Sequence, residues 1–305
     1  MNKKKLNKIF NKTILILLIL IGISYINEEL VKKENTSYAM KETLSKDSSN
    51  NNLEIYYFDV GQADSILIKE KNTNILIDAG NNEDGENLVN YLKNDLNIDK
   101  LNMIIGTHPH EDHIGGLDNI IDSFDIDTIL MPNATSTSKT FESVLNSIEN
   151  KNYKITIPKI GEEFNYDNIK LKVIYTGTNE KDLNNSSIVL KLTYFNNKFL
   201  FTGDATSKVE KKLLNKDIES DVLKIGHHGS EYSTTNDFLD KVNPKYAIIE
   251  VGKNNTYKHP KQTTLDKLNA KNIKIYRTDL DGTIKLTSDG NNITFETIKT
   301  NIDGE

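Results

Sequence analysis

The chain of 305 residues contains no cysteine. Disulfide bonds and thiolate metal ligands are therefore excluded, and any bound metal must be held by imidazole and carboxylate groups. The sequence also lacks the Gly-x-Ser-x-Gly turn that presents a serine nucleophile and the glycine-rich loop that cradles a nucleotide phosphate. These absences argue against a serine hydrolase and against a phosphate-loop enzyme.

Histidine is scarce, but it is clustered. Of the six histidines in the chain, three lie between Thr107 and His113. His227 and His228 stand side by side in a second segment, and His259 is the sixth. Structural histidines would be scattered, whereas imidazoles that share a metal must come together in space. The clustering therefore indicates a metal site.

The first cluster follows directly on an apolar run, residues 103–105, that we expect to be a strand. Side chains two residues apart in an extended segment share a face, so His108 and His110 should project together. A turn should then bring Asp112 and His113 round before a helix begins near Ile114. Nitrogen and carboxylate ligands in this arrangement suit Zn²⁺ or a similar divalent ion.

Two other loops carry side chains that can complete a two-metal site. Asp204 follows an apolar strand and a glycine, so its carboxylate can reach the same place and bridge two ions. The second histidine cluster supplies His227 or His228. Two ions about 3.5–4 Å apart that share a carboxylate and a hydroxide lower the pKa of bound water and neutralise charge on the attacked group. Such a centre suits hydrolysis of phosphodiesters, amides or thioesters.

Two further residues are candidates for supporting roles. Asp78 ends an apolar strand and precedes a turn of small residues, which suits a carboxylate that orients the histidine loop; the alternative is an ordinary turn aspartate. His259 lies just before an expected helix and could approach the metals as an acid or a phosphate ligand; the alternative is a surface histidine. Lys258 and Lys261 beside it could attract an anionic substrate.

The amino terminus differs in kind from the rest. Lysines precede an uninterrupted apolar stretch, Thr13–Ile26, and glutamates follow it, which is the pattern of an exported segment. We expect residues 1–40 to be a signal peptide or a membrane anchor that engages the membrane at least during export, and residues 41–52 to be a flexible linker. The protein would then be secreted or anchored to the outer face of the cell membrane. A buried core helix is the alternative.

Net charge bears on the partners. Residues 1–40 carry seven lysines and three glutamates, so the remainder has 31 basic and 41 acidic side chains and a net charge of −10. This negative charge argues against non-sequence-specific binding of nucleic acid as the main function, although it is compatible with a local basic groove.

Residues 53–300 read as one mixed domain. Strands are expected at 53–59, 65–68, 74–78, 103–105, 128–131, 153–157, 169–175, 188–194, 198–201, 221–225, 246–250, 274–276, 283–287 and 292–297. Helices are expected at 86–96, from 114, at 140–150, after 205, and at 235–242 and 262–271. The loops at the carboxyl ends of these strands carry every histidine.

These motifs resemble a known family. The segment His-Pro-His-Glu-Asp-His, residues 108–113, is similar to the His-x-His-x-Asp-His signature of the metallo-β-lactamase fold. Residues 58–65, 77–80, 201–205 and 223–230 resemble the ComEC/Rec2-type branch, which includes the hydrolase-like domain of DNA-uptake channels and secreted phosphorylcholine esterases. The likeness runs in order from residue 53 to about 290. It implies an α/β (α+β) fold, the four-layer αββα metallo-β-lactamase sandwich, with the site along one edge of the two sheets.

The resemblance also implies a metal-ligand set, namely His108 and His110 for one ion, Asp112, His113 and His228 for the other, and Asp204 between them. His228 is preferred to His227 because a glycine follows it, as in the Gly-His-Gly of other members. His227 would then be free to protonate a leaving group or bind an oxyanion. The expected catalytic residues are Asp112, His227 and His259.

One departure from the family pattern concerns the first ion. Many members place a further histidine on the strand before the bridging aspartate, whereas this chain has Asn184-Asn185-Ser186-Ser187 there. Asn/Ser at this place is similar to the ComEC-type branch, so we interpret it as a branch trait. We expect two divalent metal ions, with Zn²⁺ the first candidate and Mn²⁺ the second, and the departure leaves the stoichiometry open.

The expected function is that of an exported metal-dependent hydrolase whose metal-bound hydroxide attacks a phosphodiester-type bond. Its substrate would be an anionic phosphate ester, either nucleic acid or a cell-wall polymer, and β-lactams are disfavoured because the resemblance lies with the ComEC-type branch. One alternative is a non-catalytic, metal-stabilised binding module at the cell surface, and another is a scaffold with an empty site. Structural zinc sites are usually closed by four ligands, whereas this set leaves open positions, which favours the enzyme.

Overall fold

Runs of aliphatic and β-branched residues fold into two β-sheets in the computed structural model, which describes residues 52–178 and 180–299. The expectations for residues 1–40 and for the linker up to residue 51 lie outside the described residues. No helix within 52–178 and 180–299 is long and apolar enough to cross a membrane.

The first sheet has the strand order β15-β14-β1-β2-β3-β4-β5-β6 among the described residues. Its strands are β1 Leu53–Tyr57, β2 Ile66–Glu70, β3 Thr73–Ile77, β4 Lys100–Ile105, β5 Asp125–Leu130, β6 Ile155–Thr156, β14 Thr283–Ser288 and β15 Ile293–Ile298. β3 to β6 run parallel, and the strands on the other side pair antiparallel.

The second sheet has the order β13-β12-β11-β10-β9-β8-β7. Its strands are β7 Glu163–Tyr166, β8 Ile169–Tyr175, β9 Val189–Tyr194, β10 Asn197–Phe201, β11 Val222–Lys224, β12 Tyr246–Ile249 and β13 Lys274–Arg277. β10 to β13 are parallel, so both sheets place the carboxyl ends of several parallel strands at an edge, which is where α/β folds bind ligands.

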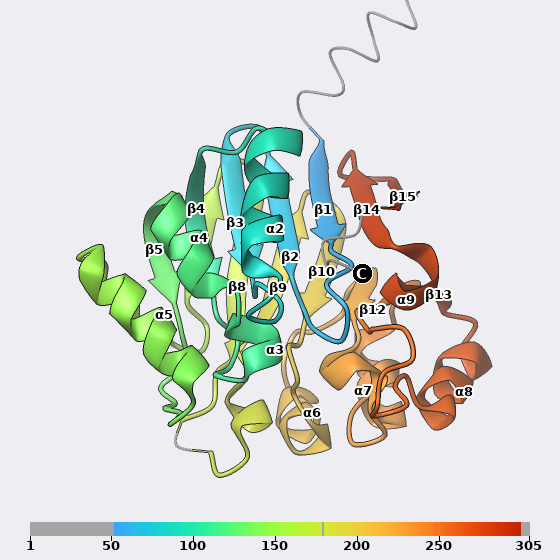
Figure 1. Cartoon of the computed structure of the whole chain (residues 1–305). Coiled ribbons are helices and arrows are strands. Elements are labelled where there is room, and N and C mark those ends of the chain that lie inside the picture. The colour runs from blue at the N-terminus through green and yellow to red at the C-terminus, as the bar shows by residue number, and fades with distance from the viewer. Residues whose placement is uncertain (1–51, 179, 300–305) are drawn as a thin grey trace, which may run out of the picture. The chain divides into compact units, whose positions relative to one another are not determined.

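Helices cover the outer face of each sheet (Figure 1). Those on the first sheet are α2 Gly85–Asn90, which continues as the π-turn η1 Tyr91–Asp95, α3 Glu111–Ile114, α4 Leu117–Ser123 and α5 Lys139–Asn150. Those on the second are α6 Ser207–Leu213, α7 Asn236–Val242 and α8 Gln262–Ala270. The short turns η2 Leu183–Ser186, η3 Gly226–Gly229 and α9 Thr278–Asp281 lie in loops.

Three apolar layers hold these elements together. In β3, Ile75 and Ile77 face the layer between the sheets, and Leu76 faces the helices. β10 repeats the alternation, with Phe199 in the layer between the sheets and Leu200 against the outer helices. Each strand of this kind is buried on both faces, which explains its nearly continuous apolar sequence. The arrangement confirms the four-layer αββα sandwich.

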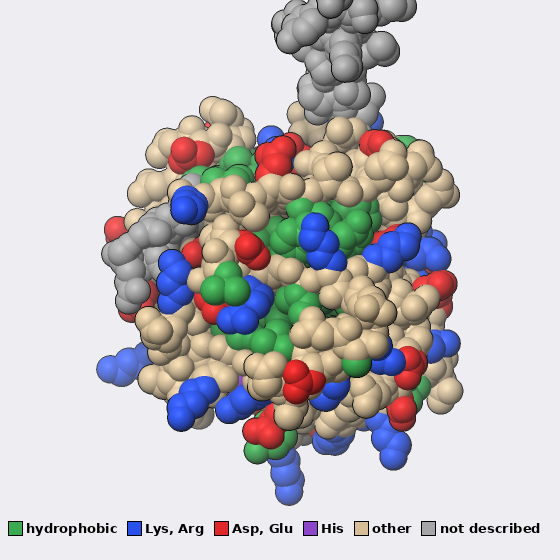
Figure 2. All heavy atoms as spheres, turned by 90° about the vertical axis from the view of Figure 1, so that its right-hand side faces the viewer, with side chains coloured by type: hydrophobic (Ala, Val, Ile, Leu, Met, Phe, Trp, Pro, Cys, Tyr) green, Lys and Arg blue, Asp and Glu red, His purple; other side chains and the backbone are tan. Residues whose placement is uncertain are grey.

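The two sheets also meet at the edge formed by β13 and β15. There the ring of Phe295 lies 4.2 Å from that of Tyr276 and 4.8 Å from that of Tyr246, measured between centroids. Figure 2 shows this side of the molecule, where apolar side chains appear among lysines and carboxylates. The aromatic cluster packs against the layer between the sheets at this edge.

Candidate metal centre

The first histidine loop follows β4, as the sequence predicts. His110 lies just before α3 with extended backbone angles, φ −93° and ψ 151°, so His108 and His110 point to the same side. Their rings lie 4.7 Å apart, and His108 Nε2 is 3.1 Å from His110 Nδ1. Asp112 and His113 then occupy the first turn of α3, which brings both side chains round to the same point.

Asp78 orients this loop, as the sequence suggested. Its carboxylate accepts hydrogen bonds from the Thr107 amide and hydroxyl, both at 2.7 Å, and lies 2.8 Å from His113 Nδ1. Because His113 donates through Nδ1, its Nε2 is left free as an acceptor. Burial raises the pKa of the Asp78 carboxyl, although its bond to His113 opposes that shift.

Four side chains from both sheets meet at one point, and we call them the four-ligand group: Asp112, His113, Asp204 and His228. Each offers a nitrogen or oxygen atom within 4.8 Å of the others. His113 Nε2 lies 3.3 Å from Asp204 Oδ1, and His228 Nε2 lies 3.3 Å from Asp112 Oδ2. Segments about 90 residues apart in sequence, those of Asp112 and Asp204, therefore converge on one site, as the sequence predicts for ligands supplied by separate loops.

This group fits a divalent cation. His113 Nε2 and Asp204 Oδ1 are buried and lie 3.3 Å from each other, and among the described residues neither has a further hydrogen-bond partner, although unpaired buried polar atoms are costly. A metal ion accepts lone pairs from both kinds of atom, and imidazole nitrogen with carboxylate oxygen is a donor set that Zn²⁺ and Mn²⁺ accept. The chemistry of the donor atoms and their lack of other partners both indicate a metal site.

The four-ligand group brings carboxylates and imidazoles of opposite charge together where they are buried from water. Burial opposes charge on Asp204, yet His113 and His228 hold the pKa of its carboxyl well below the usual range. Burial also opposes charge on His228, but Asp204 and Asp64 raise the pKa of its imidazole to about 10. Charged partners of both signs thus replace water around the group.

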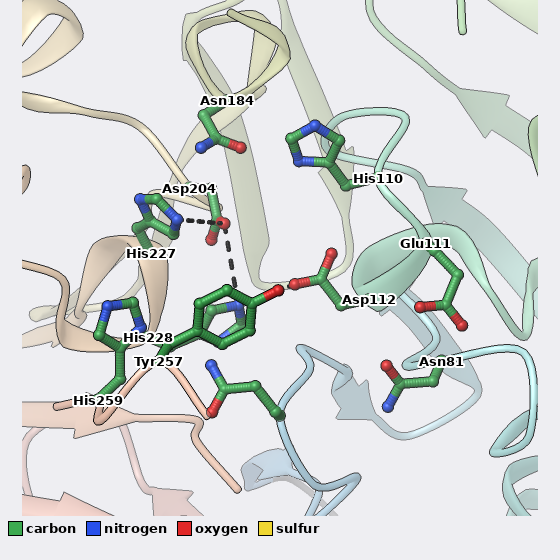
Figure 3. A pocket seen from close by; sticks show the side chains of 11 residues that line it. Asn81, His110, Glu111, Asp112, Asn184, Asp204, His227, His228, Tyr257 and His259 are labelled. Carbon is green, nitrogen blue, oxygen red and sulfur yellow. Dashed lines mark hydrogen bonds and ion pairs between the residues drawn. The ribbon is translucent and has the colours of Figure 1, made fainter. Parts of the chain in front are cut away.

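Three more histidines lie beside the four-ligand group, and we call them the histidine group: His108, His110 and His227. His108 Nε2 lies 3.9 Å from Asp204 Oδ2. His227 Nε2 lies 3.8 Å from the same atom (Figure 3). Thr107 Oγ1 contacts His108 Nδ1 at 3.1 Å, and this hydroxyl already donates to Asp78. It therefore accepts from His108, whose Nε2 is left facing Asp204.

The segment that replaces the family's further histidine supports ligands. Ser187 Oγ accepts a hydrogen bond from the Asp204 amide at 3.1 Å and lies 3.4 Å from His108 Nδ1. Asn185 is bonded to Asp182 and to Thr206. Ser187 therefore supports Asp204 and His108, and this segment contributes no imidazole of its own.

The loop η3 separates the roles of its two histidines. Both take left-handed angles, with φ 53° at His227 and φ 51° at His228. His228 turns inward, is 2% exposed, and lies 3.0 Å from the Glu250 carbonyl through Nδ1, so its Nε2 faces the four-ligand group. His227 lines the cleft instead. The Nε2 atoms of both histidines lie 3.8 Å from Asp204 Oδ2, so the two neighbours differ in burial and in their other contacts rather than in their distance to that carboxylate.

His259 approaches the same cleft. Gly229 has φ +81°, and a Cβ there would lie 2.6 Å from Pro260 Cβ, so glycine permits this close approach. The His259 ring then lies 5.8 Å from that of His227 and stacks on Tyr257 at 5.7 Å. Burial, helped by positive charge on neighbouring groups, lowers the pKa of His259 to about 4, so this imidazole is neutral at pH 7.

Five side chains of the two groups open onto one cleft of about 490 Å³ (Figure 3), namely Asp112, Asp204, His228, His110 and His227. Gln62 and Asn81 line it from the first sheet, and Asn184 and Tyr257 from loops of the second. The volume suits part of a polymer or a small ester, and the lining is polar on all sides.

Sequence reasoning missed the residues beneath the site. Asp64, Lys224 and Glu250 are each at most 1% exposed, and Lys224 Nζ lies 2.7 Å from Asp64 Oδ2. Lysine is almost never fully buried unless it is paired. The lysine that ends the apolar run 222–224 was therefore a signal that a buried carboxylate must stand opposite it.

The chain belongs to the metallo-β-lactamase superfamily, because the family model described as "Metallo-beta-lactamase superfamily" matches residues 58–252. Together with the ligand geometry, this defines a metal-dependent hydrolase-like protein. Within that class it is similar to proteins of the ComEC type. It is 30% identical over 252 residues to ComE operon protein 3 of Bacillus subtilis and 26% identical over 242 residues to competence protein ComA of Neisseria gonorrhoeae.

These alignments cover 76% and 77% of this chain but 32% of each relative, so the chain spans about a third of their length. The resemblance to the ComEC/Rec2-type branch is confirmed. Among solved structures, the metallo-β-lactamase fold protein YhfI from Bacillus subtilis matches with a TM-score of 0.53 and 9% identity, covering 78% of this chain and 100% of that one. At that identity the likeness concerns the fold alone.

Proposed function

We propose that this protein is an exported hydrolase that uses two divalent ions, Zn²⁺ or Mn²⁺, to cleave a phosphodiester-type bond. The substrate in this proposal is nucleic acid or a phosphate ester of the cell surface. The observation that carries it is the four-ligand group: within the described residues His113 Nε2 and Asp204 Oδ1 have no further hydrogen-bond partner, and Asp112, Asp204 and His228 line the cleft.

The proposed chemistry divides between the ions and the chain. Divalent ions at such a centre supply Lewis acidity and make water a nucleophile near neutral pH. Asp78 keeps the Nε2 atom of His113 available as a ligand, and the Glu250 carbonyl does the same for His228. Asp204 lies between the two groups, so one carboxylate can contact both ions.

His227 and His259 are placed to handle protons. Both line the cleft without belonging to the four-ligand group. Burial, the first cause in each case, lowers the pKa of both imidazoles, so each can accept a proton at neutral pH and pass it to a leaving group. Lys258 and Lys261 flank His259 and favour an anionic ester.

Export is part of this proposal. It depends on the lysine-rich start of the chain and on the apolar stretch Thr13–Ile26 that follows. Fractionation of cells that express the full chain tests it: the protein should appear outside the cytoplasm, and its confinement to the cytoplasm would refute this part alone.

The direct test compares the full chain with His108→Ala and Asp112→Ala in hydrolysis of bis(p-nitrophenyl) phosphate with added Zn²⁺ or Mn²⁺. Both variants should lose most of the turnover, because each lacks a proposed ligand. Asp217→Asn serves as a control, since Asp217 pairs with Lys191 and its side chain is 85% exposed. Equal turnover in all four proteins removes the proposal. Metal-dependent stabilisation without hydrolysis of any phosphodiester or phosphorylcholine ester would support a binding module instead.

A further inference from the structure

A fully buried lysine lies directly behind the proposed metal centre. Lys224 ends β11, and its side chain is 0% exposed. Its ammonium donates to Asp64 Oδ2 at 2.7 Å and to the Ile225 carbonyl at 3.0 Å, and Glu250 Oε2 lies 3.8 Å away. A buried ammonium is costly unless it is paired, so Lys224 and Asp64 depend on each other.

Asp64 also contacts ligands from both sheets. Its amide donates a hydrogen bond to the Asp112 carbonyl at 3.1 Å. Its Oδ1 lies 3.3 Å from His228 Nδ1, and its Oδ2 lies 3.9 Å from His113 Nδ1. Three members of the four-ligand group are therefore in reach of one carboxylate residue, which is not itself in that group.

The ligands that Asp64 contacts come from different sheets. Asp112 and His113 come from the first sheet and His228 from the second, so their separation depends on how the two sheets are held at this edge. Lys224 stands on the second sheet, and Asp64 precedes β2 of the first. Their ion pair thus joins the two sheets directly beneath the ligands.

We propose that Asp64, held in place by Lys224, is the positioning residue that sets the distance between the metal ligands of the first sheet and His228. A merely structural ion pair would stabilise the fold wherever it stood. This one is in contact with the ligands themselves, so its loss should move them and weaken metal binding. The inference rests on the proposed metal centre but not on the bond that the enzyme cleaves.

The chain offers a matched control. Lys191 is a second buried lysine, 4% exposed, and it pairs with Asp217 at 2.8 Å. Among the described residues, Lys191 forms its hydrogen bonds with Asp217 and not with the four-ligand group. Lys191→Met therefore removes a buried ammonium without touching the site.

The test measures Zn²⁺ and Mn²⁺ affinity by competition with a chelator, together with the melting temperature of the metal-free full chain. The double variant Asp64→Asn/Lys224→Met removes both charges at once, so neither is left buried alone. It should melt close to Lys191→Met but bind metal about 10- to 100-fold more weakly, the range typical of groups that orient metal ligands. Asp64→Glu keeps the charge for Lys224 and shifts the carboxylate, and should also weaken binding.

The outcomes separate the two ideas. If the double variant fails to fold, Asp64→Glu decides, and wild-type affinity in that variant overturns the positioning role. If the wild type binds metal and both Asp64 variants bind it equally well, the inference fails while the proposed function stands. If the wild type itself binds no divalent ion, the proposed centre fails, and the inference with it.

Discussion

The four-ligand group and the histidine group share Asp204 but are supported very differently. In the first, His113 is held by Asp78 and His228 by the Glu250 carbonyl, and Asp64 lies behind both. In the second, His227 Nδ1 is buried without a hydrogen-bond partner, and the place of a further imidazole is taken by Asn and Ser. A site whose ligands are oriented in advance loses less freedom when an ion binds.

The difference teaches that the two ions of the proposed centre should not be equivalent. We expect a tightly held ion at the four-ligand group and a weaker, exchangeable one at His108 and His110 of the histidine group, with His227 left free for proton transfer. A chain that binds one ion at low metal concentration and two at high concentration would fit this asymmetry, and the variants below can break it or sharpen it.

The largest effect should come from His113→Ala. It removes a ligand from the four-ligand group, and since an ion supplies several kcal/mol of transition-state stabilisation, kcat/KM should fall about 10³-fold or more. His110→Ala removes a member of the histidine group and should cost less at saturating metal. Elemental analysis after dialysis checks the cause: His113→Ala should lose the tight ion, and His110→Ala should keep it.

An inverted result would contradict the asymmetry. If His110→Ala lost its metal on dialysis while His113→Ala kept it, the better-supported group would not be the tighter one. Equal losses in both variants would mean that the two groups act as one site.

A smaller effect is expected from Asp78→Asn. Asp78 has φ 57°, a conformation that asparagine tolerates, so the backbone should persist. The variant removes the charge that holds His113 Nδ1, and metal affinity should fall about 10- to 100-fold. Chelator competition measures it, with the exposed Asp217→Asn as the control; unchanged affinity would show that the His113 ring is held by packing alone.

The sequence predicted the residues of the site better than it predicted their support. His108, His110 and Asp112 lie where the alternation and the turn place them, because local backbone geometry decides which way they point. Which of His227 and His228 is buried depends on the left-handed angles of η3, which no periodicity reveals. Lys224 and Asp64 meet across two sheets 160 residues apart in sequence, and that pairing is set by tertiary packing.

Central strands of the fold could be predicted from the sequence and an edge strand could not, because the two differ in how many of their faces are buried. Buried strands such as β3 and β10 read as apolar runs, whereas β7 was missed because Glu163 and Asn165 are exposed and its two aromatic residues are half-buried. Its signal was the alternation of Phe164 and Tyr166 with these polar residues, followed by a turn at Asp167. An edge strand with one covered face gives a weaker pattern than a central one.

The smallest effect concerns the acid stability of the histidine side of the cleft. His259 has a folded pKa of about 4, against 6.5 for an ordinary histidine, so the unfolded chain binds more protons between these values. Stability should therefore fall as the pH drops from 6.5 towards 4. Since the side chain is partly exposed, solvent screening limits the loss to about 1 kcal/mol or less, or a few degrees in Tm.

His259→Gln should remove that loss. Asn255 bonds to the backbone N–H and carbonyl of His259, so those contacts remain in the variant. At pH 7 the metal-free variant should melt close to the wild type, and at pH 5 it should melt a few degrees higher than the wild type, with Tyr257→Phe as a control. Positive charge on His228, His227 and Lys261 lowers the pKa of His259 further. A larger difference in melting temperature at pH 5 would therefore mean that the histidines near His259 carry charge. The absence of any gap would mean that His259 is solvated in the metal-free protein, and that this side of the cleft is still more open than the four-ligand group.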